Sequence, residues 1–454
     1  MSFFSINPAT GERIAEYPRW SEQTLSDALS QAAEAAKLWS ATALEQRCTL
    51  MHKAADIIDQ RQAELALVIT QEMGKLRREA LAEVAKCASV CRYYADNGPA
   101  FLADETIVSD AGKSFVAHEP LGTVLAVMPW NFPMWQVFRF AAPALVAGNT
   151  GLLKHASNVP GCAQAIEKIF VDAGFPAGVF ISLMIPAAQV AGVIEDPRVH
   201  AVTLTGSEPA GRQVAACAGA NLKKAVLELG GSDAFIVLDD ADIDAAVQTG
   251  VSSRFLNTGQ SCVAAKRFIV VDAIAEEFVA KFKTAVEALV PGDPSNADTS
   301  LAPMARQDLC EEIDQQVKTS ISQGAVALTG CAPIEGPGAF YQASILDHVK
   351  PGILAYHDEL FGPVAMIIRA KDENYAIRIA NDSPFGLGGC VFSGDKARGE
   401  QVARQIYTGA VFVNGLVKSD PRLPFGGVKN SGYGRELGRH GMMEFVNAKT
   451  IWIA

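Results

Sequence analysis

Residues 199–238 read VHAVTLTGSEPAGRQVAACAGANLKKAVLELGGSDAFIVL, and this stretch decides the fold class. Two β-rich runs, 199–206 and 223–230, flank a helical stretch that begins near Pro209, and a third run, 233–238, follows them. Short apolar runs that alternate with helices are typical of parallel sheets covered by helices on both faces. The stretch therefore predicts an α/β protein with a doubly wound sheet.

The same alternation extends along most of the chain. Residues 21–96 carry apolar side chains at helical spacing and predict a helical lead-in. The run RFIVVD (267–272) starts a second β-rich series, which predicts a second α/β domain packed against the first. Ligands tend to bind in the clefts between such domains. The other β-rich runs are LGTVLAVMP (121–129), NTGLLKH (149–155), VFISLMI (179–185), VAMIIRA (364–370), GGCVFSG (388–394) and GAVFVNG (409–415).

The composition argues against binding to nucleic acids and membranes. The chain has 454 residues, of which 49% are hydrophobic, and a net charge of -11 that would repel phosphate backbones and anionic lipids. No apolar run reaches the roughly 18 residues of a membrane span, and no basic segment followed by an apolar one opens the chain. The nine cysteines are odd in number and scattered, which is typical of reduced thiols. We therefore expect a cytoplasmic protein.

The segment Asn257–Cys262, NTGQSC, is a candidate catalytic loop. Its glycine and small polar residues suit a tight turn that exposes Cys262 as a nucleophile. The alternative for any cysteine is a small buried apolar side chain, and the other eight cysteines are interpreted in that way. Cys87 and Cys91 lie one helical turn apart, but no His or Cys partner has matching spacing. They are therefore assigned to the core, and no metal site is predicted.

Six motifs, in order along the chain, together resemble those of the aldehyde dehydrogenase superfamily. The resemblance extends from NPATGE (7–12) to the last predicted strand. Within the superfamily, the chain looks most like bacterial succinate semialdehyde dehydrogenases. The six motifs are PWNFP (129–133), LTGS (204–207), ELGG (228–231), GQSC (259–262), ELFGPV (359–364) and PFGGVKNSG (424–432).

The architecture of the superfamily implies three parts. Residues 1–101 and 121–227 would form a dinucleotide-binding domain, and residues 228–430 a catalytic domain. Residues 102–120 and 440–454 would form a small β-rich oligomerisation element. An exposed strand edge needs a pairing partner, so a homodimer or homotetramer is expected.

The resemblance implies covalent catalysis by Cys262. Its thiolate would attack an aldehyde, and the thioester formed later would be hydrolysed. The Asn131 side-chain amide and the Cys262 backbone N–H would hold the oxyanion, and Glu228 would deprotonate the hydrolytic water. Each assignment has a structural alternative. PWNFP can be a turn before a helix that starts at Pro133, and Glu228 can be a solvated residue at a strand end.

Cofactor binding has a weaker local signal. The chain lacks a GxGxxG loop between a strand and a helix, and GYGRELG (432–438) is too polar before its glycines to serve as one. Gly206 and Ser207 end a β-rich run, and a helix that starts near Pro209 can present its N-terminus to a pyrophosphate. The resemblance implies further contacts to a nicotinamide dinucleotide from Pro129, Trp130, Lys154, Ser157, Leu229, Glu359 and Phe361.

Ser157 favours NADP over NAD. NAD-specific members of the superfamily often have a glutamate at this position, and its charge would repel a 2′-phosphate. Serine removes this repulsion and can donate to the phosphate, while Lys154 supplies positive charge and His155 can add to it. NADP is therefore the predicted cofactor, with NAD as a second acceptor.

Arg139 and Ser419 are the predicted contacts for a carboxylate at the far end of the substrate. Arg139 lies two helical turns after Asn131, and the resembling enzymes have an arginine there and a hydroxyl donor where Ser419 stands. The structural alternative for Arg139 is an ion pair on a helix surface. A common form of the family has a second arginine where this chain has Leu256. Arg254 is two positions away, and the role is not transferred to it.

These features predict an NADP-dependent succinate semialdehyde dehydrogenase that acts on a small-molecule aldehyde. Four other interpretations stay open: a dehydrogenase for another small or medium aldehyde, a CoA-acylating aldehyde dehydrogenase, a cysteine hydrolase and a non-catalytic homologue. Glu228 argues against CoA acylation, and a hydrolase would need a histidine base paired with Cys262. The presence of Cys262, Asn131 and Glu228 together argues against a non-catalytic role.

Overall fold

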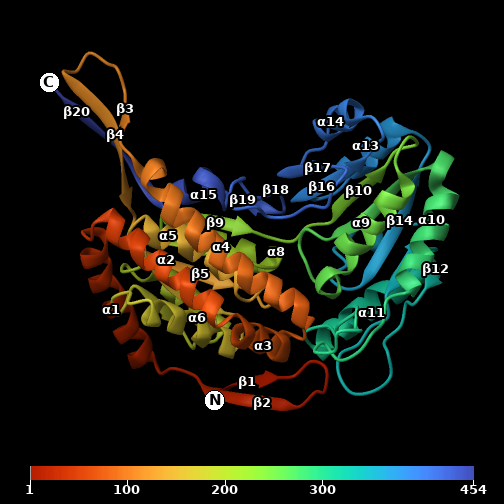
Figure 1. Ribbon diagram of the computed structural model, residues 1–454, viewed down its shortest axis with the longest axis horizontal. Helices are drawn as coiled ribbons and strands as arrows, with labels where there is room; N and C mark the ends of the chain where they lie inside the picture. Colours follow the sequence, from red (N-terminus) through yellow and green to blue (C-terminus); the bar gives the residue numbers. More distant parts are fainter. Residues whose placement is uncertain (1) are drawn as a thin grey trace.

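Two large β-sheets form the body of the molecule (Figure 1). The computed structural model describes residues 2–454. The smaller sheet has six strands in the order β19-β9-β8-β5-β6-β7, and only β19 runs antiparallel to its neighbour. The six strands are β5 (Thr123–Met128), β6 (Thr150–His155), β7 (Phe180–Ser182), β8 (Ala201–Thr205), β9 (Lys224–Glu228) and β19 (Gly432–Tyr433).

Alternate residues of these strands face two separate cores, one on each side of the sheet. On β5, Val124 and Ala126 belong to one core and Leu125 to the other. Because both faces are covered, most strand positions are buried, which explains the short and largely apolar runs of the sequence. Helices α2 (Leu44–Gln60), α3 (Gln62–Met73), α4 (Arg77–Leu102), α5 (Trp135–Val146) and α6 (Pro160–Asp172) enclose the first core. Helices α1 (Glu22–Ser40), α7 (Val190–Glu195) and α8 (Glu208–Ala220) enclose the second.

The larger sheet has seven strands in the order β12-β13-β14-β11-β10-β16-β17, and only β12 is antiparallel to its neighbour. Two cores again lie on its two faces. The strands are β10 (Asp233–Val237), β11 (Ala265–Val271), β12 (Val326–Thr329), β13 (Ser344–Asp347), β14 (Val364–Ala370), β16 (Gly388–Phe392) and β17 (Ala410–Val413). Helices α9 (Ile243–Phe255) and α10 (Asp272–Glu287) contribute to one core. Helices α11 (Gln307–Ser322), α12 (Leu354–His357), α13 (Glu373–Asn381) and α14 (Lys396–Ala403) contribute to the other.

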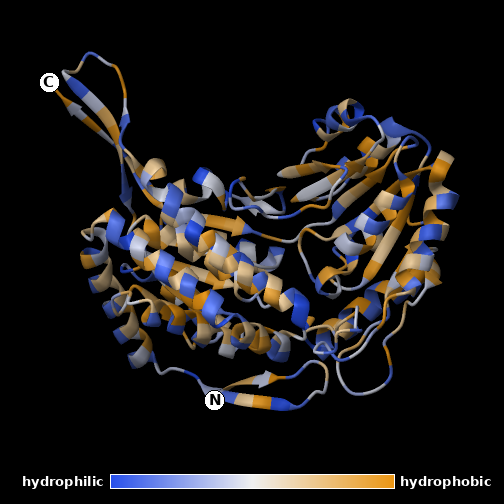
Figure 2. Ribbon diagram, viewed as in Figure 1, coloured by the Kyte–Doolittle hydropathy of each residue, from blue (hydrophilic) through white to orange (hydrophobic). Residues whose placement is uncertain are grey.

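A three-stranded arm extends away from this body (Figure 1). Strand β4 (Lys113–Pro120) lies between β3 (Glu105–Thr106) and the C-terminal strand β20 (Val446–Ile453). Hydrophobic and hydrophilic residues mix along the arm (Figure 2), and Val108 and Trp452 are 98% and 53% exposed. The C-terminal strand expected from the sequence is therefore present, and its pairing partner is the segment near residues 102–120.

The structure confirms the α/β class and the helical lead-in, which forms α1 to α4. It assigns the run 233–238 to the larger sheet as β10, although that run continues the first series in sequence. Two antiparallel strand pairs were not predicted, because their residues are half exposed and lack a long apolar run. They are β1 (Ser2–Ile6) with β2 (Arg13–Pro18), and β15 (Phe385–Gly386) with β18 (Val428–Lys429). The short helices η1 (Ala187–Gln189), η2 (Leu256–Gly259) and α15 (Gly438–Met443) complete the described elements.

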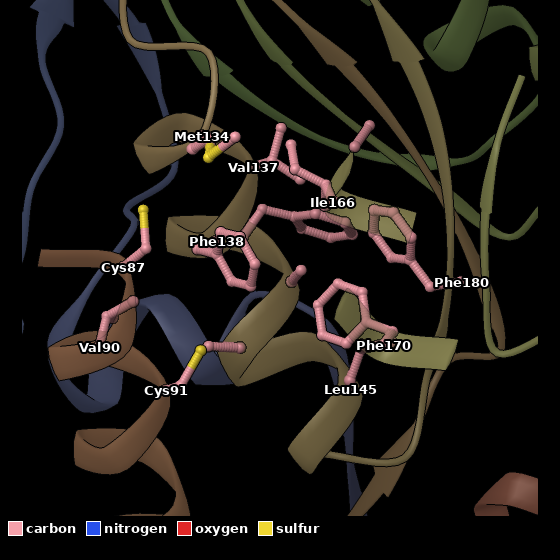
Figure 3. Packing of buried hydrophobic residues seen from close by; sticks show 14 of the residues in the cluster. Cys87, Val90, Cys91, Met134, Val137, Phe138, Leu145, Ile166, Phe170 and Phe180 are labelled. Atoms are coloured by element: carbon pink, nitrogen blue, oxygen red, sulfur yellow. The ribbon is translucent and has the colours of Figure 1, made fainter. Parts of the chain in front are cut away.

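All nine cysteines are free thiols. Cys87 and Cys91 on α4 are completely buried and lie on the side of α4 that faces α5 (Figure 3), which confirms their assignment to the core. Within residues 2–454, no three His, Cys, Asp or Glu side chains converge in a way that could hold a metal ion. No helix in the same range is long and apolar enough to span a bilayer.

Candidate active site

The loop that carries Cys262 follows α9 and has an unusual backbone. Asn257, Thr258 and Gly259 all have positive φ angles, of 54°, 56° and 72°. Asn257 donates from its side chain to the carbonyl of Gln260 at 3.0 Å, and Thr258 donates to the carbonyl of Ala302 at 3.0 Å. These bonds stabilise a conformation that non-glycine residues rarely adopt. The loop is therefore preorganised.

Arg254 holds this loop against the segment that follows Glu359. Its buried guanidinium donates to the carbonyls of Gly259 at 2.6 Å and Gly362 at 2.7 Å. A Cβ at Gly259 would collide with the Gly362 carbonyl, so the close approach requires glycine. Arg254 is thus a structural residue that fixes two motifs to each other. Its guanidinium binds backbone carbonyls of the protein.

Cys262 lies partly buried on the wall of a cavity of about 490 Å³. Burial raises the pKa of its thiol to about 12, although Arg139 and Lys266 oppose the rise. Lys266 donates to the Cys262 carbonyl at 2.9 Å and is itself paired with Glu359 at 3.1 Å. The resting thiol is therefore protonated, and its reactivity depends on a change in local charge or on a base.

Asn131 is held next to the cysteine loop with a defined amide orientation. Gln136 donates to its Oδ1 at 3.1 Å, so the Nδ2 group faces the Gln260 carbonyl, to which it donates at 3.0 Å. The Asn131 carbonyl accepts from Asn257 at 2.8 Å. The second N–H of the Asn131 amide makes no hydrogen bond within residues 2–454, and Asn131 is not among the residues that line the cavity of Cys262.

Lys75, which precedes α4, and Glu83 on α4 hold the PWNFP turn in place. Lys75 donates to the Asn131 carbonyl at 2.9 Å and forms a buried ion pair with Glu83. Glu83 also accepts from the backbone amides of Met134 and Trp135 at 2.9 and 3.0 Å, which are at the start of α5. A carboxylate at this position caps the positive end of the helix. The turn therefore both starts a helix and places an amide donor.

Glu228 ends β9 with a buried carboxyl group that has no hydrogen-bond partner within residues 2–454. Burial raises its pKa well above the usual value, and Glu436 raises it further, while Arg139 lowers it. The interpretation as a solvated strand-end residue is wrong, because the side chain is 2% exposed. Glu228 lies against Gly426 and is not among the residues that line the cavity of Cys262.

Arg139 and Ser419 both line the cavity of Cys262. Arg139 on α5 is buried and forms an ion pair with Glu436, and its guanidinium donates to the Thr205 hydroxyl at 3.3 Å. The ion pair is therefore internal, and not on the helix surface. Ser419 accepts a hydrogen bond from Lys86 at 2.7 Å and from the Trp135 indole at 3.1 Å.

The N-terminus of α8 has features that fit a pyrophosphate. Ser207 is the N-cap residue, its side chain makes no capping bond, and Pro209 lies in the first turn. The position of Gly206 is open, since an added Cβ would contact only its neighbour Leu204. Leu229 packs so closely on the helix that a Cβ at Gly211 would collide with it. The free backbone amides at this helix end can therefore donate hydrogen bonds to an anion.

Lys154 and Ser157 flank the end of β6. Lys154 is 8% exposed, burial lowers its pKa, and no carboxylate in residues 2–454 pairs with it. Ser157 is exposed in the turn before α6. The expected charge from His155 is wrong: the buried ring accepts from the Ala156 amide at 2.9 Å and contacts the Pro133 carbonyl at 2.7 Å, and burial lowers its pKa to about 4. His155 is neutral and fastens the PWNFP turn to β6.

Glu359 and Phe361 meet the other motifs at the boundary between the two sheets. Glu359 accepts from the Gly231 amide at 3.0 Å, and a Cβ at Gly230 would collide with its carboxylate. The Phe361 ring packs edge-on against Trp130 at 5.9 Å between ring centroids. The residues expected to hold a dinucleotide thus come from five chain segments, and their amides, lysine and aromatic rings fit such a group.

Three residues near the site were not predicted from the sequence: Lys86, Lys266 and Glu436. Lys266 follows Cys262 by four positions, inside a strand where a buried lysine is an anomaly. Glu436 lies in GYGRELG, a segment too polar before its glycines for a phosphate-binding loop and without another signal in its sequence. Lys86 faces the cavity from an amphipathic helix, where a lysine carries no distinguishing signal.

Known proteins resemble this chain over its full length. The sequence pattern described as aldehyde dehydrogenase family matches residues 2–451. A probable NADP-dependent succinate-semialdehyde dehydrogenase of Synechocystis is 50% identical, and the match covers 100% of both chains. A succinate semialdehyde dehydrogenase of Escherichia coli, named for NAD(P), is 47% identical over 99% of this chain and 97% of its own.

A solved structure of similar shape supports the same grouping. The succinic semialdehyde dehydrogenase of Streptococcus pyogenes, crystallised in complex with NADP, is 40% identical. Its TM-score is 0.98, and the match covers 99% of both chains. Both the sequence and the arrangement of the sheets are therefore shared with these proteins.

Proposed function

The chain belongs to the aldehyde dehydrogenase family, and we propose that it oxidises succinic semialdehyde to succinate with NADP as hydride acceptor. The observation that carries the substrate assignment is the cavity that contains Cys262 together with Arg139 and Ser419. A substrate with an aldehyde at one end and a carboxylate at the other requires a nucleophile and a cationic region in one cavity. Here one cavity contains both.

The reaction begins at the Cys262 sulfur. Its thiolate adds to the aldehyde carbon, and the free Asn131 N–H and the Cys262 backbone N–H stabilise the oxyanion of the thiohemiacetal. The dinucleotide, when bound, supplies the hydride acceptor that makes oxidation to the thioester feasible. Water then attacks the thioester carbonyl, Glu228 takes its proton, and cleavage of the C–S bond releases succinate and the Cys262 thiolate. For this last step, Glu228 must be ionised and must reach the cavity.

The residues proposed to hold the dinucleotide have separate tasks. The amides at the start of α8, with Gly206 and Ser207, bind the pyrophosphate. Lys154 and Ser157 bind the adenosine ribose and its 2′-phosphate, while Glu359 binds the other ribose. The remaining contacts of the group are apolar or backbone contacts from Pro129, Trp130, Leu229 and Phe361.

Initial rates test the proposed substrate. The purified protein should oxidise succinic semialdehyde with a higher kcat/KM than butanal, which has the same number of carbons and no carboxylate. Each aldehyde is measured with NADP and with NAD. A preference for butanal would discard the substrate and leave the dehydrogenase chemistry standing.

Replacing Ser157 with glutamate is expected to reverse the cofactor preference. A carboxylate at this exposed turn would repel the 2′-phosphate of NADP and accept the 2′-hydroxyl of NAD. We expect the NADP to NAD ratio of kcat/KM to fall by roughly 10-fold or more, since a like-charge contact costs several kcal/mol. Ser157→Gln introduces a side chain of the same size as glutamate without its charge and serves as the control. An unchanged ratio in Ser157→Glu would contradict the assignment.

We propose further that the arm mediates a homodimer or homotetramer. Val108 and Ile453 of the arm are 98% and 49% exposed, and β3 and β20 have unpaired edges. Val108→Asp combined with Ile453→Asp is expected to lower the mass measured by light scattering. Leu38→Asp, at another exposed position on α1, should leave the mass unchanged. A wild-type mass equal to one chain would overturn the proposal.

The nine free thiols support a reducing compartment, and we propose the cytoplasm.

A further inference from the structure

Lys86 is a cation in the substrate cavity to which the proposed mechanism assigns no task. It projects from α4 into the cavity that Cys262, Arg139 and Ser419 also line. Its ammonium group donates to the Ser419 hydroxyl at 2.7 Å and lies 4.1 Å from the centre of the Trp135 ring. Trp135 in turn donates to the same hydroxyl at 3.1 Å. Three side chains thus converge on one polar point of a mostly apolar cavity.

The charge of Lys86 is not neutralised by the protein. Within residues 2–454, no carboxylate oxygen lies within 4.0 Å of its ammonium group. The nearby carboxylates have other partners: Glu83 pairs with Lys75, and Asp420 pairs with Arg422. A partly buried ammonium with one neutral acceptor retains strong affinity for an anion.

Arg139 is in a different electrostatic state. Its guanidinium is already paired with the buried carboxylate of Glu436, and it also contacts the Phe425 ring at 4.6 Å. An anion that enters the cavity is therefore attracted to Arg139 and repelled by Glu436. Leu256 lines the same cavity and supplies no charge. Arg78 and Lys418 line the same cavity and also form no ion pair within residues 2–454. Lys86 differs from them in donating to the Ser419 hydroxyl.

We propose that Lys86 is the main electrostatic contact for the distal carboxylate of the substrate, with the Ser419 hydroxyl as its hydrogen-bonding neighbour. This inference rests on the proposed function, and it names the residue that makes the enzyme select an acidic aldehyde over a neutral one. The carboxylate replaces the lone hydroxyl as acceptor for the ammonium group. Arg139 then contributes to carboxylate binding through its positive charge at longer range, and it anchors α5 to Glu436.

The ionisation of Lys86 makes the contact sensitive to pH. Burial and the positive charge of Arg139 on α5 lower its pKa to about 8, whereas Glu83 and Cys87 on α4 and Asp420 after β17 raise it. The ammonium form binds a carboxylate, so affinity for the semialdehyde should weaken as pH rises through 8. A neutral aldehyde lacks this contact and should show no such loss.

The test compares two substrates in three variants. Lys86→Met keeps an unbranched side chain of similar length and removes the charge. Its ratio of kcat/KM for succinic semialdehyde over butanal is expected to fall by roughly 10-fold, the scale of one desolvated ion pair. Lys86→Arg should retain most of the ratio and abolish its decline above pH 8, since arginine stays charged. Lys418→Met, at an exposed lysine of the same cavity, should change the ratio less than twofold.

The outcomes separate this inference from the function on which it rests. A wild-type preference for the semialdehyde that survives in Lys86→Met overturns the inference alone. An equal fall with both aldehydes also overturns it, because that result assigns Lys86 a structural role. A wild-type enzyme without the preference overturns both the inference and the proposed substrate.

Discussion

Replacing Cys262 with alanine is expected to reduce aldehyde oxidation by roughly 10⁴-fold or more, the scale seen when a covalent nucleophile is removed. The side chain is the only thiol on the cavity wall among residues 2–454, so no neighbour can replace it. The loop should stay folded, because its hydrogen bonds come from Asn257, Thr258 and Arg254. Steady-state rates with saturating aldehyde and NADP give the measurement.

Binding of NADP to Cys262→Ala provides the control, since none of the proposed dinucleotide contacts is the thiol. Cys262→Ser preserves the side-chain size and should be almost as inactive, because a hydroxyl ionises far less readily than a thiol. Cys331→Ala removes another partly buried thiol outside the cavity and should retain wild-type activity. Oxidation of aldehyde by Cys262→Ala at more than a few per cent of the wild-type rate would remove the nucleophile assignment.

The thiol pKa predicts how Cys262 reacts in the cofactor-free protein. The thiolate is the reactive form, and a pKa of about 12 means that its fraction grows with pH across the whole accessible range. Alkylation by iodoacetamide, followed at the Cys262 peptide by mass spectrometry, should therefore accelerate up to pH 10 without a plateau. A plateau below pH 9 would show that the resting site stabilises the thiolate.

The fold could be predicted from the sequence because burial on both faces leaves a plain signal. Strands such as β5 are apolar at nearly every position, and the runs of β5 and β11 agree with the observed elements. The pairing order carries no local signal. The run 233–238 follows β9 in sequence and joins the other sheet, because its partners β11 and β16 come from later in the chain. The arm strand β4 is half exposed and has no continuous apolar run. Only its C-terminal partner β20 was therefore predicted as a strand from its own residues.

The site was predictable where a motif fixes both residue type and local geometry. The Asn131 amide is joined to the loop of Cys262 by its hydrogen bond to the Gln260 carbonyl, whereas the catalytic roles of both residues stay predictions. Electrostatic partners were not predictable, because a charge pair such as Arg139 with Glu436 joins positions almost 300 residues apart. The same limit applies to His155, which looks like a phosphate ligand in sequence and proves to be a buried neutral ring.

Replacing Glu228 with glutamine is expected to give at most about one equivalent of NADPH per site and then stall. The first half of the reaction builds the thioester, whereas its hydrolysis needs a base that an amide cannot provide. Rapid mixing with excess semialdehyde and NADP shows the burst, and mass spectrometry of the stalled protein should show the acyl group on Cys262. Glu444→Gln, at another carboxylate near Glu228, should turn over continuously. Continuous turnover of Glu228→Gln at the wild-type rate would remove the base assignment.

The burial of Glu228 also predicts how the stability and the kcat of the protein change with pH. Burial and Glu436 raise its pKa, so the folded protein binds this proton more tightly than the unfolded chain does. Stability from this group is therefore present below the unfolded pKa and decreases as pH rises towards the folded pKa. Glu228→Gln removes that decrease and should unfold at a temperature no lower than wild type at pH 8. In the wild type, kcat should rise with pH as Glu228 ionises, while the burst amplitude stays constant.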